Sequence, residues 1–378
     1  MTDWNEIRQA YPAQQPLVNL NNAAVSPATL VTEQAMIDAY RFINQNPDVN
    51  MWEHLDAKIP AIKSKLAALA DCDAQEIALN RNSTEGLCTA IFGLPMEPGD
   101  GVLLPDWDYA SMRASWFQRQ LREGISINPV RFTLLDSDDD IVEAYREAIT
   151  PRTKAMLITH MLHWTGRVLP VERLCALARE YGITTIVDGA QSFGQIPVSF
   201  RKLGCDVFVT SLHKWLCAPV GNGMMIIRAE LIDKFWPLFS PYEEAPIGIN
   251  KFDTPNLGTL NCAAQTAIEP AIDFHNSVGI DNIHHRLRFL TRYWIERASD
   301  IPGFRLHTPL DRDDLGAVSL FSLGHIGVRD VESALRVRDF RVRYREVRDV
   351  SGIRVSPHIY TTTEELDRFV DALREIAR

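Results

Sequence analysis

The sequence predicts an α/β protein in which a largely parallel β-sheet is covered by helices on both faces and is followed by a smaller α+β domain. Between residues 77 and 227, short apolar runs alternate with amphipathic stretches of helical spacing. Runs that are apolar on both faces are typical of strands buried inside a parallel sheet. After about residue 260, the pattern changes to long helical stretches with a few strand-like runs and a closing amphipathic helix.

The expected strands of the large sheet are short apolar runs with polar or glycine neighbours, at residues 101–106, 154–160, 183–190, 206–211 and 223–228. Two stretches between them have apolar residues at helical spacing and end in glycine, which commonly terminates a helix; they cover residues 111–124 and 171–182. In the C-terminal part, helices are expected at 263–279, 283–300 and 363–378, and strands at 317–323 and 352–360.

These patterns divide the chain into three expected parts. Residues 1–20 form an N-terminal segment that joins the small domain, residues 21–260 form the large domain, and residues 261–378 form the small C-terminal domain. A chain of 378 residues is long enough for such a two-domain arrangement.

Composition narrows the class of protein. Apolar residues make up 46% of the chain and charged residues 23%, with a net charge of -10. An acidic surface argues against nucleic acid or an anionic membrane as a partner. The six cysteines are scattered without a CxxC pair, and no apolar run reaches the ~18 residues of a membrane helix. We therefore expect no disulfides, no signal peptide and a cytoplasmic location.

Two polar residues follow buried strands and raise the question of their chemistry. Asp188 directly follows the apolar run 184–187, and a carboxylate buried there is costly unless a cation is near it. Lys214 follows the run 206–211 among apolar neighbours, which lower the pKa of an amine and make it a nucleophile. In an open parallel sheet, ligands bind beyond the carboxyl ends of the strands, so both residues are expected at one site.

Other strand ends allow two interpretations each. Ser83 and Thr84 open a helix, where they either bind an anion such as phosphate or simply cap the helix. Trp107 either lies over a flat ligand or packs in the core. His160 and His163 form an HxxH spacing that indicates a metal only weakly, because no third ligand accompanies them. We expect no metal.

Pyridoxal 5′-phosphate is the cofactor that would use these features together. It needs a lysine for its aldehyde, a carboxylate for its ring nitrogen and a helix N-terminus for its phosphate. Lys214, Asp188 and the helix that begins at Ser83 supply these three groups.

Several motifs in order resemble the class V aminotransferase family of fold-type I pyridoxal-phosphate enzymes, and most closely its isopenicillin N epimerase-like and cysteine desulfurase-like members. The matching segments are "LNNAAVSP" (residues 20–27), the region around Asp188, "HKWLCAPVGNG" (213–223) and "IRVSPHIYTTTEELDRFVDAL" (353–373). The resemblance covers nearly the full chain. It implies a seven-stranded, mainly parallel sheet between helices, a small amino-acid substrate and a homodimer with its active site near the interface.

The resemblance also implies roles for the cofactor residues. Lys214 would be the Schiff-base lysine and the acid–base that moves the α-proton, and Asp188 would pair with the pyridine nitrogen. Gln191 and His163 would lie beside the phenolic oxygen, and His163 is counted with Lys214 and Asp188 as catalytic. Trp107 would stack on the ring. Contacts with the phosphate or its edge are implied for Ser83, Thr84, Ser211 and His213.

Substrate contacts follow from the same resemblance. Arg354 would bind the substrate α-carboxylate, for which a guanidinium fork is well suited. The pocket would be lined by Asn22, Ala23 and Ala24, while Thr259 would reach a phosphate across the dimer interface. The basic run at residues 336–349 is either a solvated strand edge or a site where an arginine meets an anionic substrate; Arg341, Arg343 and Tyr344 are its candidates for a second polar group.

Two departures from the family pattern bear on the reaction. Desulfurases carry a nucleophilic cysteine some fifteen residues before the arginine, and this chain has none there; Cys217 is interpreted as a packing residue. His213 stands where plain aminotransferases usually have glutamine. Transamination, epimerization, and β- or γ-elimination or cyclization remain open, with the epimerase and lyase outcomes favoured.

Two other functions are weighed against this one. A nucleotide-dependent oxidoreductase would need a G-x-G-x-x-G turn after an early strand, and the "GNG" at residues 221–223 precedes a strand instead. A non-catalytic protein that has kept the cofactor fold would bind the cofactor without exchanging any α-proton.

Overall fold

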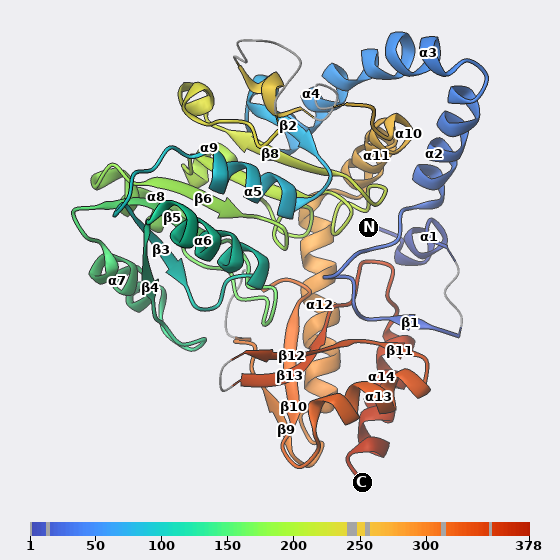
Figure 1. Cartoon of the computed structure of the whole chain (residues 1–378). Helices are drawn as coiled ribbons and strands as arrows, with labels where there is room; N and C mark the ends of the chain where they lie inside the picture. The colour runs from blue at the N-terminus through green and yellow to red at the C-terminus, as the bar shows by residue number, and fades with distance from the viewer. Residues whose placement is uncertain (1, 13–15, 240–247, 254–257, 311–314, 348–349) are drawn as a thin grey trace.

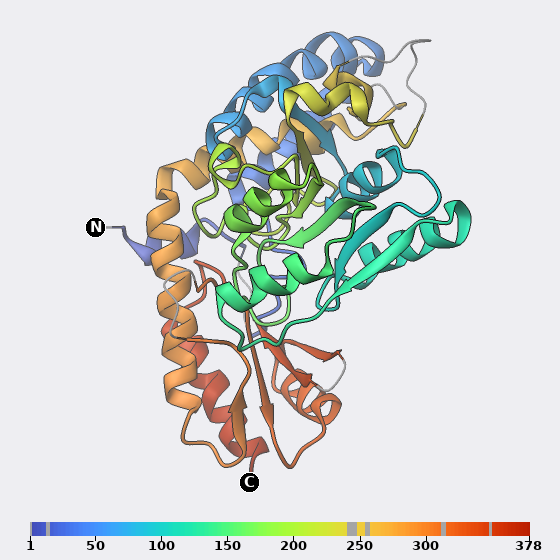
Figure 2. The same cartoon turned by 90° about the vertical axis from the view of Figure 1, so that its left-hand side faces the viewer.

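The structure is a computed structural model, and it describes residues 2–12, 16–239, 248–253, 258–310, 315–347 and 350–378. It contains a large and a small part, which lie one above the other in Figures 1 and 2. Of the basic run at residues 336–349, Arg348 and Asp349 lie outside the described residues.

The large part is built on a seven-stranded sheet with the order β2-β8-β7-β6-β5-β3-β4. Its strands are β2 (Ile77–Asn80), β3 (Gly101–Pro105), β4 (Ser126–Val130), β5 (Thr153–Thr159), β6 (Thr184–Asp188), β7 (Val207–Ser211) and β8 (Gly223–Ile227). All neighbours pair in parallel except β8, which is antiparallel to both β2 and β7. The predicted mainly parallel sheet is therefore confirmed.

Helices cover both faces of this sheet because alternate strand residues point to opposite sides. Met156 and Ile158 of β5 belong to a core shared with α4 (Ile59–Ala70), α7 (Asp138–Ala148) and α8 (Val171–Glu180). Ala155 and Leu157 belong to a second core, shared with α5 (Ser83–Gly93) and α6 (Ala110–Glu123). This arrangement explains the runs that are apolar on both faces.

Strand β4 is the element of this sheet that the apolar pattern does not reveal. It lies at the edge of the sheet, and four of its five residues, all except Val130, are half-buried or exposed. It also contains Pro129, which an edge strand tolerates because one side of its backbone needs no partner. Only a strand with neighbours on both sides must be apolar throughout.

The small part has a four-stranded antiparallel sheet with the order β12-β13-β10-β9. Its strands are β9 (Phe304–Leu306), β10 (Ser319–Leu323), β12 (Arg343–Val347) and β13 (Val350–Val355), and its helices are α12 (Ile280–Ala298), α13 (Val328–Val337) and α14 (Thr363–Ile376). Trp294 of α12 is fully buried between the sheet and α14, with Phe321 and Phe369 edge-on to it.

The N-terminal segment packs on the small part. Strand β1 (Val18–Asn19) pairs in parallel with β11 (Phe340–Arg341), and Val18 and Leu20 are buried in the core of the small part. Helix α1 (Trp4–Gln9) precedes it, and Arg8 is ion-paired with Glu365 of α14 at 2.7 Å.

The remaining elements are helices and turns. They are α2 (Leu30–Ile43), α3 (Pro47–Val49), the π-helix η1 (Asn50–Leu55), α9 (Phe200–Leu203), α10 (Cys262–Thr266), α11 (Ile268–Val278) and the 3₁₀ turns η2 (Asp56–Lys58), η3 (Ala74–Glu76), η4 (Ala229–Lys234) and η5 (Ile249–Phe252). The helix predicted over residues 263–279 is thus divided into α10 and α11. Because Ile268 and Ile272 of α11 are buried in the core of the large sheet, we propose that the small domain begins near Gly279 rather than at residue 261.

Candidate active site

A cavity of about 280 Å³ lies at the carboxyl ends of the central parallel strands. Thr159, Asp188 and Ser211 are the last residues of β5, β6 and β7, and all three line this cavity. The residues proposed from the sequence that line it are Ala23, Ala24, Ser83, Thr84, His163, Asp188, Gln191, Ser211, His213, Lys214 and Arg354. The cavity therefore brings together segments from positions 23 to 354 of the chain.

One end of the cavity is formed by the N-terminus of α5. Asn82 caps the helix by accepting the backbone N–H of Glu85 at 2.9 Å. The Ser83 N–H donates to Ser211 Oγ at 2.8 Å, and the two serine hydroxyls lie 2.9 Å apart. Gly86 allows this approach, because a Cβ there would lie 2.6 Å from a Val209 methyl of β7. The helix dipole and the hydroxyls make this end suitable for an anion.

The middle of the cavity holds the half-buried amine of Lys214 and the buried carboxylate of Asp188. Burial lowers the pKa of Lys214 to about 8, although the Asp188 carboxylate opposes the shift. Burial raises the pKa of Asp188, whereas the Lys214 cation and the N–H of Ala190, which donates to Asp188 Oδ1 at 2.9 Å, act in the opposite direction. An amine with a pKa near 8 has a substantial neutral fraction near neutral pH, as a nucleophile requires.

Two hydrogen bonds fix the side-chain amide of Gln191. Its Nε2 donates to the Ala23 carbonyl at 2.9 Å, and its Oε1 accepts the Trp215 indole N–H at 3.0 Å. Trp215 in turn stacks on His358, with ring centroids 5.5 Å apart and planes at 10°. The loop that carries Lys214 is thereby held against the segment that contains Ala23.

The other end of the cavity is formed by two arginines and a histidine. Arg354 is 1% exposed, and its guanidinium donates to the His163 carbonyl at 3.1 Å and to Asn21 Oδ1 at 2.8 Å. Arg345 lines the same cavity. Burial and the positive charges of Arg354, Arg345 and Lys214 lower the pKa of His163 well below its usual value, so this imidazole is neutral.

Tyr109 lines the cavity, and Trp107 does not. Trp107 is buried in the core of the large part, where its indole N–H donates to the Phe132 carbonyl at 2.7 Å, and it does not line the cavity. Tyr109, two residues later at the start of α6, lines it and lies edge-on to His163 at 5.3 Å. The second aromatic residue of "DWDY" was the signal in the sequence for an aromatic ring at the cavity. Only the turn before α6 decides which of the two rings lines it.

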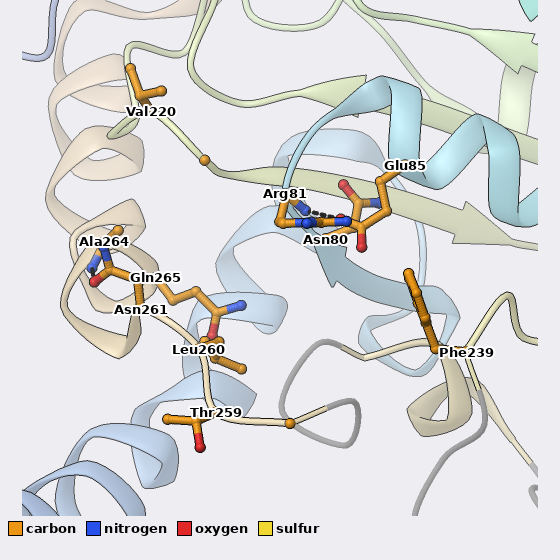
Figure 3. Close-up of a pocket in the computed structure, with 12 residues that line it drawn as sticks. Asn80, Arg81, Glu85, Val220, Phe239, Thr259, Leu260, Asn261, Ala264 and Gln265 are labelled. Atoms are coloured by element: carbon orange, nitrogen blue, oxygen red, sulfur yellow. Dashed lines mark hydrogen bonds and ion pairs between the residues drawn. The ribbon is translucent and has the colours of Figure 1, made fainter.

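Thr259 lies in a neighbouring pocket of about 440 Å³. Figure 3 shows that one side of this pocket is lined by Asn80, Arg81 and Glu85, and the other side by Leu260, Asn261 and Gln265. The two cavities are adjacent, because residues 80–85 contribute to both. Thr259 does not line the cavity of Lys214 in its own chain.

Arg343 does not line the Lys214 cavity either. It is 3.7 Å from Glu332 of α13, and its guanidinium lies over the ring of Tyr344. Arg345, which was not among the candidates from the sequence, lines the cavity instead. Cys217 is buried beside Trp215 and Tyr11, and burial raises the pKa of its thiol to about 12. Such a thiol is an unreactive packing residue.

The residues present fit pyridoxal phosphate. The α5 end offers hydroxyls and a helix N-terminus to a phosphate, Lys214 offers an amine that lines the cavity to an aldehyde, and the buried Asp188 carboxylate offers an acceptor to a ring N–H. An α/β sheet with a lysine and an aspartate at its strand ends is typical of fold-type I pyridoxal-phosphate enzymes.

Comparison with known proteins identifies the family. The model of the family described as "Aminotransferase class-V" matches residues 18–369, so the chain belongs to this family of enzymes, and pyridoxal 5′-phosphate is its cofactor. The isopenicillin N epimerase of Streptomyces clavuligerus is 29% identical over 99% of this chain and 98% of its own. A probable cysteine desulfurase of Synechocystis is 27% identical over 98% of this chain and 95% of its own.

A solved structure supports the fold. A C-DES mutant with glycine covalently linked to the PLP cofactor has a TM-score of 0.89 and 21% identity, covering 99% of this chain and 100% of its own. The predicted fold-type I architecture is confirmed. No helix within the described ranges is long and apolar enough to cross a membrane.

Proposed function

We propose that this protein is a pyridoxal-phosphate enzyme that acts on a small amino acid through Lys214, and that it epimerizes the α-carbon or eliminates a β- or γ-group. The observation that supports this most directly is the half-buried Lys214 beside the buried Asp188 in one cavity. A relative covered over nearly its whole length is named an isopenicillin N epimerase. Transamination is the second candidate, because it begins with the same proton transfer.

Each residue of the cavity has a task in this proposal. The cofactor, when bound, withdraws electrons from the α-carbon of an attached amino acid and makes its α-proton acidic. The Asp188 carboxylate would keep the proton on the ring nitrogen, the α5 N-terminus with Ser83, Thr84, Ser211 and His213 would hold the phosphate, and Gln191 and His163 would lie beside the phenolic oxygen. Lys214 Nζ removes the proton at Cα and returns it, while the Arg354 fork orients the α-carboxylate.

Tyr109 is added to this set in place of Trp107. The Tyr109 ring is 45% exposed at the cavity and can lie over a flat ligand, whereas Trp107 is held in the core by its bond to Phe132. Ala23 and Ala24, whose side chains are small, leave room for the substrate. Asn22, also proposed from the sequence, is fully buried; it does not line the cavity but accepts a hydrogen bond from the Tyr360 hydroxyl.

Desulfurization is disfavoured on chemical grounds. Among the described residues that line the cavity there is no cysteine, and the buried Cys217 thiol has a pKa of about 12. A sulfur-accepting nucleophile needs an accessible thiol that ionises near neutral pH. The relatives named as cysteine desulfurases therefore indicate the fold and cofactor of this chain more than its product.

We also propose that the enzyme works as a homodimer in the cytoplasm, with Thr259 reaching the phosphate site of the partner subunit. Thr259 shares its pocket with Val220, which is 72% exposed, and Phe239, which is 46% exposed (Figure 3). All six cysteines are unpaired, as in a reducing compartment. Light scattering on the eluting holoenzyme should give twice the chain mass of 42.7 kDa; a monomer with full activity would overturn the dimer proposal.

The test of the proposed function uses the cofactor-loaded protein in D₂O with a panel of amino acids. Mass spectrometry should show deuterium at the α-carbon of at least one of them, chiral chromatography should detect its enantiomer or epimer, and keto-acid assays should detect elimination or transamination. Borohydride reduction followed by peptide mapping should place the cofactor on Lys214. Cofactor on another lysine, or no exchange with any amino acid, would refute the assignment.

A further inference from the structure

Two arginines from neighbouring strands of the small sheet line the Lys214 cavity. Arg354 is on β13 and Arg345 is on β12. In the antiparallel register, Arg343 is opposite Arg354 and Arg345 is opposite Gly352. Residues that are opposite each other, and residues two apart on one strand, share a face of the sheet. Arg343, Arg345 and Arg354 therefore begin on the same face.

The two arginines of β12 differ in their ion pairs. Arg343 has a carboxylate partner, Glu332, at 3.7 Å, and Glu332 Oε1 also accepts the Tyr344 N–H at 3.2 Å. Arg345 has no ion pair with any carboxylate in the described part of the chain, and its Nε is buried without a hydrogen-bond partner there. Its one hydrogen bond among these residues runs from Nη1 to the Tyr344 carbonyl at 3.5 Å.

The cavity consequently has more positive than negative groups. Lys214, Arg345 and Arg354 line it, while Asp188 is its one carboxylate among the described lining residues. The Nε of Arg354 is also buried without a hydrogen-bond partner in the described residues. A buried and a half-buried guanidinium of like charge at one cavity are costly. Burial lowers the pKa of both, and the charge of Arg345 lowers the pKa of Arg354 further. Anions at this end would offset that cost.

An amino acid supplies only one anion to this end of the cavity. Its α-carboxylate is assigned to Arg354 in the proposed function, and the cofactor phosphate is assigned to the opposite end at α5. Arg345 is then a half-buried cation with an unused donor, and it lines the same cavity as Arg354. A guanidinium in such a position is matched best by a planar carboxylate.

We propose that Arg345 binds a second carboxylate at the end of the substrate side chain, so that the substrate is an amino acid with an acidic side chain. This inference rests on the proposed function, because it uses Arg354 for the α-carboxylate. It replaces Arg343, which the sequence favoured, by Arg345.

Binding of simple dicarboxylates to the holoenzyme tests this inference without knowledge of the substrate. Succinate, glutarate and adipate are compared with butyrate, valerate and caproate by calorimetric titration. At least one diacid should bind about 10- to 100-fold more tightly than its matched monoacid, since a second charge-assisted pair forms. In Arg345→Gln this preference should fall to less than about threefold, and Arg345→Lys should restore part of it.

Two further variants make the result specific. Arg329→Gln removes an exposed arginine that pairs with Glu346 at 2.9 Å on the far side of β12, and it should keep the preference of the native protein. Arg343→Gln tests the competing assignment. Loss of the preference in Arg343→Gln but not in Arg345→Gln would overturn the proposal, as would native holoenzyme that binds diacids and monoacids equally.

The failure of this inference can be told apart from failure of the proposed function. If α-protons of neutral amino acids exchange at Lys214 while no diacid preference exists, only the role of Arg345 is wrong. If the diacid preference depends on Arg345 but no amino acid exchanges its α-proton, the cavity binds acidic ligands without the proposed catalysis.

Discussion

The two sheets supply opposite ends of one cavity in different ways. The seven-stranded sheet contributes residues at or directly after the ends of parallel strands, including Asp188, Ser211 and Lys214. The four-stranded sheet contributes Arg345 and Arg354 from within two antiparallel strands. The position of the first group follows from chain order, because all parallel strands end at the same edge. The position of the second depends on register and on which charges nearby side chains neutralise.

The two ends also differ in charge balance. At the strand-end side, the Lys214 cation has the Asp188 carboxylate as its electrostatic partner. At the small-sheet side, Glu332 is the one carboxylate in the described part of the chain whose charge acts on Arg345, and it contacts Arg343 and Tyr344 instead. At the strand-end side, the Lys214 cation has its counter-charge within the chain. At the small-sheet side, we propose that a ligand supplies the counter-charge for Arg345.

Replacing Lys214 should have the largest effect. In Lys214→Ala, α-proton exchange should fall by about 10³-fold or more, since both the covalent attachment point and the general base are removed. Exchange is measured by mass spectrometry in D₂O, with Lys202→Ala, an exposed lysine on α9, as the control. Retention of more than a tenth of the native rate would mean that Lys214 is not the base.

Asp188→Asn should reduce exchange by roughly 10²-fold, since the ring nitrogen loses its charged partner. It should also change the pH dependence of cofactor capture by the apo-protein. The Lys214 pKa is about 8, so the neutral amine is depleted, and capture slows, by about tenfold per pH unit below this value.

The Asp188 carboxylate raises the pKa of Lys214, so its removal lowers that pKa and keeps the amine neutral at more acidic pH. The midpoint of the capture rate, followed by absorbance, should therefore move to lower pH in Asp188→Asn. A midpoint that stays in place or rises would show that the two groups do not interact.

Arg354→Lys should have an intermediate effect at the small-sheet end. It keeps the charge but loses the fork that can hold a carboxylate while bonded to His163 and Asn21. KM for every reactive amino acid should rise about 10- to 100-fold with a smaller change in kcat, because ground-state binding is weakened. A fall in kcat with an unchanged KM would indicate that Arg354 acts on the reacting atoms instead.

The smallest effect is expected for Glu332→Gln, which removes the negative charge beside Arg343 but keeps an acceptor for the Tyr344 N–H. Arg343 should stay over the Tyr344 ring, so the diacid preference should change by less than about threefold. The calorimetric series with dicarboxylates measures this. A tenfold increase in preference would show that Glu332 is what keeps Arg343 out of the cavity.

Most of the large part could be predicted from the sequence because its strands are buried on both faces. Their apolar runs located β3, β5, β6, β7 and β8 to within a few residues. Strand β4 was missed because an edge strand needs no continuous apolar run, and the helix at residues 263–279 was not expected to divide, because both halves are apolar on the buried face.

The candidate site residues that line the cavity differ from those that do not in what positions their side chains. Asp188, Ser211 and Lys214 were placed at the cavity by the strand they follow. Trp107 and Arg343 each lie two residues from the side chain that lines the cavity, Tyr109 and Arg345. In each case the predicted residue makes its contacts outside the cavity, Trp107 with the Phe132 carbonyl and Arg343 with Glu332 and the Tyr344 ring, and the motif itself does not show these contacts.

The sequence by itself determined the sheet, its covering helices and the chemistry at its strand ends, because burial and chain order are local properties of the pattern. Only the tertiary structure decided which of two nearby arginines faces Lys214. That choice depends on where along β12 each arginine lies relative to the cavity and on the contacts of Arg343 with the Tyr344 ring and Glu332, and neither is encoded in the spacing of the arginines themselves.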